Sequence, residues 1–403
     1  MVYQTGVEAM QYGYFANIHD PTQARDYGQM IAEVRQLAQV CETAGFAAFW
    51  LPEHHFSVWG RELLGNPLMM AADIAARTER IRIGLAAAII TFWHPLRLAE
   101  DLALLDQLSG GRLEIGVGRG NYGLEASNLN PAADPNNRAG NVKVFLETLD
   151  VVRKALTQDR FAHRGDLFAF PAPGFRADKA HTVKDRNYID PVTGELVRLT
   201  TYPRPKQRPM PPLWQVVSED YESIRFCARN DMGIIMWRPT TKEVRRRLAV
   251  YKEAWEPEAG RAMVAPRAAL VRDTFVAESA SEARRIAGRA VMDALNFANW
   301  RGARIFLDPD ERLTADEEAR LGKELTFDFV NERALLFGSP DDVLAKLIAL
   351  HEETGISQII FKSCWPGLPH EHTLRSIERL THEVLPRFER RLTKAAGARA
   401  AAE

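Results

Sequence analysis

The sequence contains little cysteine and no excess of either charge. Cys41, Cys227 and Cys364 are its only cysteines among 403 residues. Because they are odd in number and far apart, they argue against a disulfide framework or a zinc site, and we expect free thiols in a reducing cytoplasm. Lysine and arginine total 52 against 53 aspartate and glutamate residues, a net charge of −1. The chain therefore lacks the basic excess that is typical of nucleic-acid-binding proteins.

Long apolar runs are also missing from the sequence. No run reaches the roughly 18 residues of a membrane-spanning helix. The N-terminal segment shows no basic stretch followed by an apolar one, as a signal peptide would. Neither a repeat of about 20–50 residues nor a low-complexity linker divides the chain. We therefore expect a cytoplasmic protein without membrane contact, with one domain over residues 1–393 and a flexible tail over 394–403.

Short apolar runs alternate with stretches of helical period, as is typical of parallel strands joined by crossover helices. The predicted strands are Val7–Phe15, Phe46–Leu51, Ile81–Ile90, Leu113–Val117, Leu213–Val217, Gly233–Trp237, Ala268–Val276 and Ile356–Lys362. The predicted helices include Tyr27–Thr43, Pro67–Thr78, Leu96–Leu108, Val142–Leu156, Ser218–Asn230, Thr241–Trp255, Ser281–Phe297, Pro340–Glu353 and Glu371–Arg391. Eight strand–helix alternations predict an α/β fold, the (β/α)8 or TIM barrel.

Three segments interrupt this alternation. Asn121–Arg138 is a long polar loop, Pro171–Pro212 carries eight prolines and a predicted hairpin, and Trp300–Asn331 is acidic. We interpret them as insertions in the barrel loops, where barrel enzymes keep their chemistry. Decoration of the surface is the alternative for each.

Two adjacent histidines, His54 and His55, follow the second predicted strand in the motif Phe49–Phe56. Histidine exchanges protons near neutral pH, and the C-terminal end of a barrel strand is where catalytic side chains lie. On a loop, neighbouring side chains point in different directions, so one histidine can face a pocket while the other is structural. A purely structural role for both is the alternative.

Small residues mark two further stretches. Ala86–Ala88 leave the backbone open to a large flat molecule, or else allow tight packing of a helix. Gly116 and Gly118 do not complete a dinucleotide-binding motif, because Asn121 stands where the third glycine is required. Arg119 suits the recognition of a phosphate or carboxylate, unless it is a surface arginine balanced by Glu125.

The segment from His54 to Tyr122 resembles the bacterial luciferase-like flavin-dependent monooxygenases. The resemblance is carried by Phe49-Trp50, Glu53–Phe56, Trp93–Asp101, Leu104–Arg112 and Gly116–Tyr122. Weaker matches are Pro211–Trp214, Phe337–Pro340 and Gly355-Ile356, so that the likeness extends in order over about residues 7–390.

The resemblance implies a TIM barrel that binds reduced FMN from a separate flavin reductase. In the luciferase branch, the flavin forms a C4a-peroxide with O2 and oxygenates a small organic substrate. By this likeness, His54 transfers protons, His55 is its neighbour, and Glu125 stands where luciferase has an aspartate that tunes the flavin. Ala86 and Ala87 match a pair beside the flavin ring, where we expect a cis peptide at Ala86-Ala87 or Ala87-Ala88.

Further flavin contacts follow from the same likeness. Arg119 and Arg138 match two phosphate-binding arginines. Glu219 and Ser223 match ligands at the phosphate end, near a helix N-terminus that itself attracts anions. The expected flavin site is completed by Tyr122, Val217 and Trp237.

The sequence departs from the family at two site positions. Gly118 replaces the reactive cysteine of luciferase, which removes a thiol and is expected to enlarge the pocket. Asp220 stands where the family more often has a serine that faces the phosphate, so it either caps the helix or competes with the phosphate for the same N–H groups. Light emission is therefore not implied, and a plain monooxygenase is expected.

These observations predict a two-component FMNH2-dependent monooxygenase that acts on a small apolar substrate of the aldehyde, ketone, terpenoid or aromatic polyketide class. The aromatic residues near the predicted strand ends, which support an apolar cavity, are Phe15, Phe49, Phe56, Trp93, Trp237 and Trp300. A deazaflavin-dependent hydride-transfer oxidoreductase of the same fold and a non-catalytic flavin-binding protein are the alternatives. The resemblance further implies a homodimer and a transient contact with the reductase.

Overall fold

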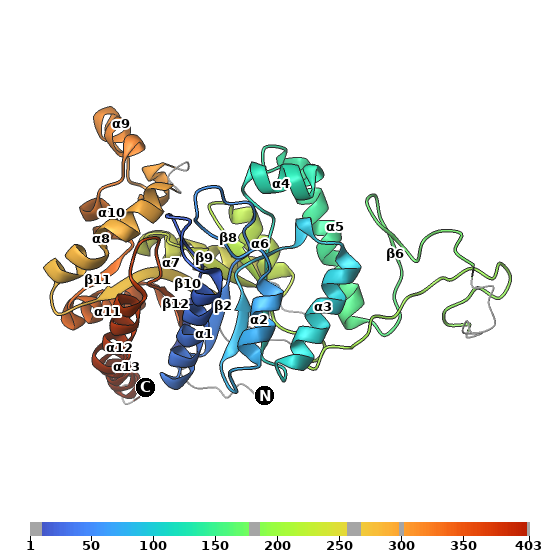
Figure 1. Ribbon diagram of the computed structural model, residues 1–403, viewed down its shortest axis with the longest axis horizontal. Coiled ribbons are helices and arrows are strands. Elements are labelled where there is room, and N and C mark those ends of the chain that lie inside the picture. Colours follow the sequence, from blue (N-terminus) through green and yellow to red (C-terminus); the bar gives the residue numbers. More distant parts are fainter. Residues whose placement is uncertain (1–9, 177–185, 256–266, 298–301, 401–403) are drawn as a thin grey trace. The chain divides into compact units, whose positions relative to one another are not determined.

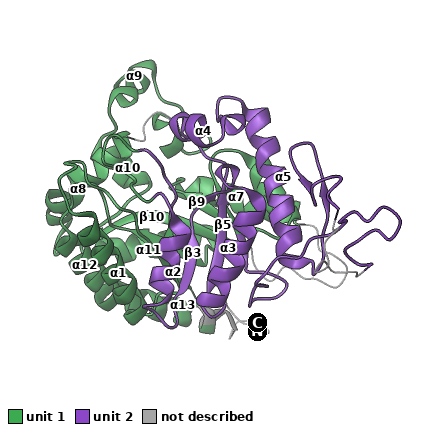
Figure 2. Cartoon of the chain, turned by 45° about the vertical axis from the view of Figure 1, so that its right-hand side comes forward, with its two compact units in different colours: residues 1–51, 57–64, 214–403 green, residues 52–56, 65–213 purple. Residues whose placement is uncertain are grey.

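A computed structural model describes residues 10–176, 186–255, 267–297 and 302–400 (Figure 1). Trp300 and the start of the first predicted strand lie outside these residues. The chain divides into two compact units (Figure 2). Unit 1 comprises residues 1–51, 57–64 and 214–403, and unit 2 comprises residues 52–56 and 65–213.

Unit 1 holds most of the parallel strands. They are β1 (Gln11–Phe15), β2 (Ala48–Leu51), β8 (Leu213–Val217, whose first residue belongs to unit 2), β9 (Gly233–Trp237), β10 (Ala268–Val276) and β12 (Gln358–Lys362). Their order is β2-β1-β12-β10-β9-β8, and β11 (Leu336–Gly338) pairs with the end of β10. All nine residues of β10 are buried. Burial on both faces is typical of a parallel sheet that helices cover, and in β10 it includes the polar residues Arg272, Asp273 and Thr274.

Unit 2 holds β3 (Arg82–Leu85), β4 (Ala88–Ile89) and β5 (Leu113–Gly118), all parallel. The register moves from Gly84 opposite Glu114 to Ala88 opposite Val117, so β3–β4 has one residue more than β5 between these pairs. The predicted third strand is thus interrupted at Ala86-Ala87. With β3–β4 taken as one strand, the eight predicted strands are all present among the described residues, and the fold is the predicted (β/α)8 barrel.

The predicted helices are also present, with ends that differ by a few residues. They are α1 (Tyr27–Thr43), α2 (Pro67–Ala75), α3 (Pro95–Leu108), α5 (Arg138–Thr157), α6 (Tyr221–Arg229), α7 (Thr241–Ala254), α8 (Ala280–Phe297), α11 (Pro340–Thr354) and α12 (His370–Arg379). A π-helical turn, Leu380–Val384, leads from α12 into α13 (Leu385–Ala400). Helix α13 therefore includes part of the segment 394–403, whose flexibility stays a prediction. Within the described part of the chain, no helix combines the length and the apolar character of a membrane span.

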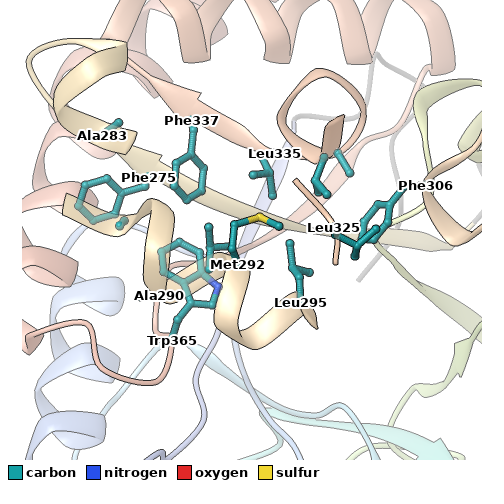
Figure 3. Close-up of a cluster of buried hydrophobic side chains, with 14 of the residues drawn as sticks. Phe275, Ala283, Ala290, Met292, Leu295, Phe306, Leu325, Leu335, Phe337 and Trp365 are labelled. Atoms are coloured by element: carbon teal, nitrogen blue, oxygen red, sulfur yellow. The ribbon is translucent and has the colours of Figure 1, made fainter. Parts of the chain in front are cut away.

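The segment 300–331 is not the plain loop that the sequence suggests. Its described part contains a 3-10 turn (Ala303–Phe306), α9 (Ala315–Lys323) and the start of α10 (Phe327–Arg333). Phe306 and Leu325 pack in one buried cluster with Phe275, Phe337 and Trp365 (Figure 3). The apolar side chains of this segment therefore anchor its described part to the rest of unit 1.

The other two insertions also contain regular structure. Residues 121–138 include α4 (Gly123–Leu129) and a 3-10 turn (Pro131–Ala133), where the sequence suggests only a polar loop. The predicted hairpin in 171–212 is confirmed, because Ile189 and Leu196 form an antiparallel bridge and the Val197 N–H donates to the Tyr188 carbonyl. A second antiparallel pair, β6 (His163–Arg164) and β7 (Ala169–Phe170), lies nearby in the chain.

Candidate active site

Each of the two histidines after β2 contacts a buried carboxylate in unit 2. The Nδ1 atom of His54 lies 3.3 Å from Oε1 of Glu125, and Nε2 of His55 lies 2.9 Å from Oε1 of Glu53. The backbone N–H of His55 donates to the same Glu125 oxygen at 2.8 Å. Glu125 therefore fixes both the ring of His54 and the loop that carries it, while His55 faces a different acid. The two histidines have separate partners, as the divergence of neighbouring loop side chains suggests.

Glu125 comes from the first turn of α4 and is 2% exposed. Its second oxygen, Oε2, is buried and has no hydrogen-bond partner among the described residues. A buried carboxylate oxygen without a donor is costly, so a bound group with an N–H or O–H would stabilise it. Next to it, the rings of His54 and Tyr122 lie 5.4 Å apart. The structure thus brings four of the predicted site residues together, namely His54, His55, Tyr122 and Glu125.

Glu53 is a buried acid at the candidate site that sequence reasoning did not single out. It is 1% exposed, and besides the His55 ring it accepts hydrogen bonds from Nε1 of Trp93 at 2.9 Å and from the backbone N–H of Ile89 at 2.7 Å. Both of its oxygens are therefore engaged. The sequence does show an acid between a buried strand and two histidines. Because an acidic residue in a loop is usually exposed to solvent, this position alone does not predict burial. Glu53 joins the histidine loop to the strand that follows Ala86-Ala87.

The peptide between Ala86 and Ala87 is cis, at one of the two bonds where we expect it. Both alanines are buried, and β5 packs closely against them. A Cβ atom at Gly116 would lie 1.8 Å from the Leu85 carbonyl oxygen, so the close approach of the backbones requires glycine there. A Cβ atom at Gly118 would lie 2.9 Å from Ile89 and 3.1 Å from Ala87. Ile89 thus takes up much of the space that the missing cysteine was expected to leave.

The loop after β5 is fixed to the start of α5. The Arg119 carbonyl accepts hydrogen bonds from the Thr91 hydroxyl at 3.0 Å and from the Asn141 side chain at 2.9 Å. Asn141 lies in the first turn of α5, and Arg138 is the first residue of that helix. The Arg119 backbone therefore lies beside a helix N-terminus that carries the second predicted phosphate ligand. Free N–H groups, the helix dipole and arginine together favour an anion.

The remaining predicted ligands lie in unit 1, at the ends of β8 and β9. Val217 is the last residue of β8, and Trp237 is the last residue of β9. The exposed pair Glu219–Arg304 joins the predicted phosphate-end acid to the 300–331 segment at 3.0 Å. Asp220 is the N-cap of α6, and the Ser223 hydroxyl donates to it at 3.1 Å. Asp220 therefore caps the helix, and it also accepts a hydrogen bond from Ser223, whose side chain was expected to contact the phosphate.

Comparisons with known proteins agree with this architecture. The model of the family described as luciferase-like monooxygenase matches residues 10–358. The oxygenase component of the flavin-dependent trigonelline monooxygenase from Acinetobacter baylyi is 25% identical over 94% of this chain and 96% of its own length. The alkanal monooxygenase alpha chain of the Kryptophanaron alfredi symbiont is 41% identical, but over only 28% of this chain and 31% of its own.

A solved structure shows the same fold. The oxygenating constituent of 3,6-diketocamphane monooxygenase from Pseudomonas putida, in complex with FMN, superposes with a TM-score of 0.68 at 21% identity. The match covers 94% of this chain and 98% of that one. Because the family model covers most of the chain, the protein belongs to the luciferase-like monooxygenases, a family of flavin-dependent enzymes.

Proposed function

We propose that this protein is the oxygenase component of a two-component monooxygenase that takes reduced FMN from a separate flavin reductase. With O2 as co-substrate, it would oxygenate a small organic molecule with a largely apolar body. The observation that carries the proposal is the joint placement, in unit 2, of the His54–Glu125 pair and of the glycine-backed Ala86-Ala87 segment. We further propose that it acts as a cytoplasmic homodimer.

The residues present fit a flavin. Ala86 and Ala87 carry the small side chains that the approach of a flat ring to the backbone requires, and the unpartnered Oε2 of Glu125 is an acceptor for a bound group. Arg119 and Arg138, with the α5 N-terminus, would hold the phosphate. When bound, reduced FMN supplies the activation of O2 that protein side chains cannot provide.

The chain's own contribution is to orient groups and to move a proton. Glu125 engages Nδ1 of His54 and so orients the ring, and in this proposal the oriented imidazole exchanges a proton with the reacting molecules. Glu53 holds His55 and the Ile89 backbone, so that the loop and the alanine segment keep a fixed geometry. A preorganised site of this kind needs little rearrangement at the moment of reaction.

Anaerobic titration with reduced FMN, reduced riboflavin and a reduced deazaflavin tests the choice of cofactor. We expect reduced FMN to bind most tightly, with a preference over riboflavin of about ten- to a hundredfold, the value of a charged hydrogen bond to phosphate. Arg119→Ala should remove most of that preference. Tighter binding of the deazaflavin would favour hydride transfer, and tight flavin binding without turnover on any tested substrate would favour a flavin-binding protein.

A further inference from the structure

A buried charge cluster lies toward the C-terminal ends of β9, β10 and β12 in unit 1, beside Trp237, one of the residues expected to contact the flavin. Arg238, Asp273, Lys362 and Trp365 are 7%, 0%, 4% and 3% exposed. In a (β/α)8 barrel, this end of the strands carries the chemistry. A charge buried in such a place belongs either to a structural ion pair or to a ligand site, and its contacts distinguish the two.

The cluster faces the concave side of the sheet. Asp273 is in register with Lys362, and Val271, two residues earlier, is in register with Trp237. Since side chains alternate along a strand, Asp273, Lys362 and Trp237 point to the same face. The Trp237 ring meets Phe15 edge to face at 4.9 Å, although β1 and β9 are separated by β12 and β10. Only the concave face allows rings on such strands to meet, so the cluster adjoins an aromatic wall.

Arg238 reaches this face through an unusual backbone conformation. It follows β9 directly, and simple alternation would point it to the opposite face. Its φ of 60° lies in the left-handed region, which residues other than glycine seldom adopt. In this conformation its Nε and Nη2 atoms both donate to the Asp273 carboxylate. The chain therefore turns a second cation toward Lys362.

The single carboxylate is already occupied by other donors. Asp273 Oδ1 accepts from Trp365 Nε1 at 2.7 Å and from Arg238 Nη2 at 3.1 Å, and Oδ2 accepts from Arg238 Nε. Nζ of Lys362 lies 3.7 Å from Oδ1, and its hydrogen bond goes to the Cys364 carbonyl at 3.1 Å. In the described part of the chain, Asp273 is the only carboxylate that forms an ion pair with either cation. Two buried cations thus share one anion.

Lys346 shows how this protein satisfies a structural lysine. Its ammonium donates three hydrogen bonds, to the Asn331 side chain at 2.9 Å and to the carbonyls of Leu335 and Phe337 at 3.2 Å each. An ammonium has three N–H donors. Lys346 uses all three N–H donors. Lys362 donates one hydrogen bond to a carbonyl, and its Nζ atom lies 3.7 Å from the Asp273 carboxylate, which also pairs with Arg238. Lys362 therefore keeps the capacity to bind further acceptors.

Charge in the neighbourhood supports this interpretation. Burial, the largest influence, lowers the pKa of Lys362, and Arg238 acts in the same direction. Asp273, Cys364 and the half-buried Glu62 oppose the shift in pKa only in part. Arg272, on the opposite face of β10, is a further buried cation, and burial lowers its pKa to about 9. An added anion would stabilise the charged lysine.

We propose that Lys362 and Arg238 form a subsite for the carboxylate of an organic-acid substrate, whose apolar body lies against Phe15 and Trp237. This inference rests on the proposed function only in naming the ligand as the substrate. The aromatic wall beside the cations favours a carboxylate attached to an apolar body over free phosphate, which would need more donors than the two cations have to spare.

The test is calorimetric titration of the flavin-free protein at pH 7 with matched acids and primary amides. The pairs are benzoate and benzamide, 2-naphthoate and 2-naphthamide, and decanoate and decanamide. For at least one pair, we expect the acid to bind about tenfold more tightly than its amide, the usual scale for one charged hydrogen bond. Lys362→Met should abolish this preference, Lys362→Arg should keep part of it, and the matched control Lys346→Met should leave it unchanged.

Several results would overturn the proposal. They are equal affinity of acids and amides, no binding of any member of the panel, an unchanged preference in Lys362→Met, and inorganic phosphate that competes as well as the acids do. If Lys362→Met does not fold, the comparison of acid with amide in the wild-type protein still decides. Because these titrations contain no flavin, their failure leaves the proposed oxygenase intact. Failure of FMN-dependent turnover would likewise leave the carboxylate preference measurable.

Discussion

At the residue scale, the site depends on two histidine–carboxylate contacts that differ in what they hold. Glu125 orients the ring of His54 and also the backbone of the loop. Glu53 holds His55 together with Trp93 and Ile89. In the proposed function, the first contact orients the histidine that exchanges protons, and the second gives a rigid support. The two histidines should therefore respond differently to substitution.

We expect His54→Ala to keep the fold and to lower the rate of product formation at least about a hundredfold, the usual scale for a general acid–base group. His55→Ala should affect the rate less and the melting temperature more, because it removes a partner from the buried Glu53. Steady-state kinetics and circular dichroism melting of both variants provide the comparison. Small and equal losses of rate would exclude His54 from proton transfer.

Glu53→Gln should destabilise the protein by about 1–3 kcal/mol. The NH2 group of the glutamine side chain would replace one acceptor oxygen, so that a buried N–H donor would lose its hydrogen bond. Urea unfolding measures this difference. The partly exposed Glu100, which pairs with Arg97, provides the control, and Glu100→Gln should change stability by less than about 0.5 kcal/mol. If both variants unfold alike, Glu53 does not support the loop.

At the scale of the element, most strands and helices are visible in the sequence because buried parallel strands read as short apolar runs. The 300–331 segment was missed as a folded element, since its few apolar positions, such as Phe306 and Leu325, stand among many charges. One local signal was available there: Thr314 and Glu317 have the spacing of a capping box, which the structure confirms at the start of α9.

The candidate site was predictable in part. The loop position of His54 could be read from its place after a strand, but Glu125 lies 71 residues further along, and no spacing rule joins the two. Only the family resemblance brought them into one prediction. The roles of Glu53 and Arg238 depend on contacts between different strands and on a backbone turn, which a single sequence does not display.

The glycines of β5 and α9 give a test of backbone packing. Gly116→Ala should destabilise the protein by more than about 2 kcal/mol, because its Cβ atom would overlap the Leu85 carbonyl and force the strands apart. Gly322→Ala is the matched change in α9, where nothing lies within 4 Å of the added atom. It should stabilise the protein by up to about 1 kcal/mol. Thermal unfolding of both variants should show opposite signs; equal effects would contradict the described register of β3–β5.

The start of α11 should show a defined pH dependence. Hydrogen bonds from the Ser339 side chain and backbone lower the pKa of Asp342. A carboxyl group with a lowered pKa contributes stability above its unfolded pKa, near 4, and loses that contribution as the pH falls through the folded value. Ser339→Ala should therefore cost about 1 kcal/mol at pH 7 and less at about pH 3. A pH-independent difference in urea unfolding would show that Asp342 does not take part in the cap.

At the scale of the whole molecule, the proposed function requires a flavin that passes between two proteins. Asp220 and Ser223 bond to each other at the α6 N-terminus, so this end offers few groups to a phosphate. Weak retention of oxidised FMN would follow, and the protein would purify nearly colourless. In the proposed function, a flavin held in this way would be taken up in its reduced form from a reductase in solution and released after reaction.

The most direct measurement is mass spectrometry of products formed under ¹⁸O2 by the purified protein with NADH, FMN, a generic flavin reductase and a panel of apolar carbonyl compounds and organic acids. We predict that at least one compound gains a single ¹⁸O atom, only when FMN and this protein are both present, and that His54→Ala suppresses the labelled product. Turnover that leaves the product unlabelled, or labelled product formed equally without this protein, would contradict its assignment as a flavin-dependent oxygenase.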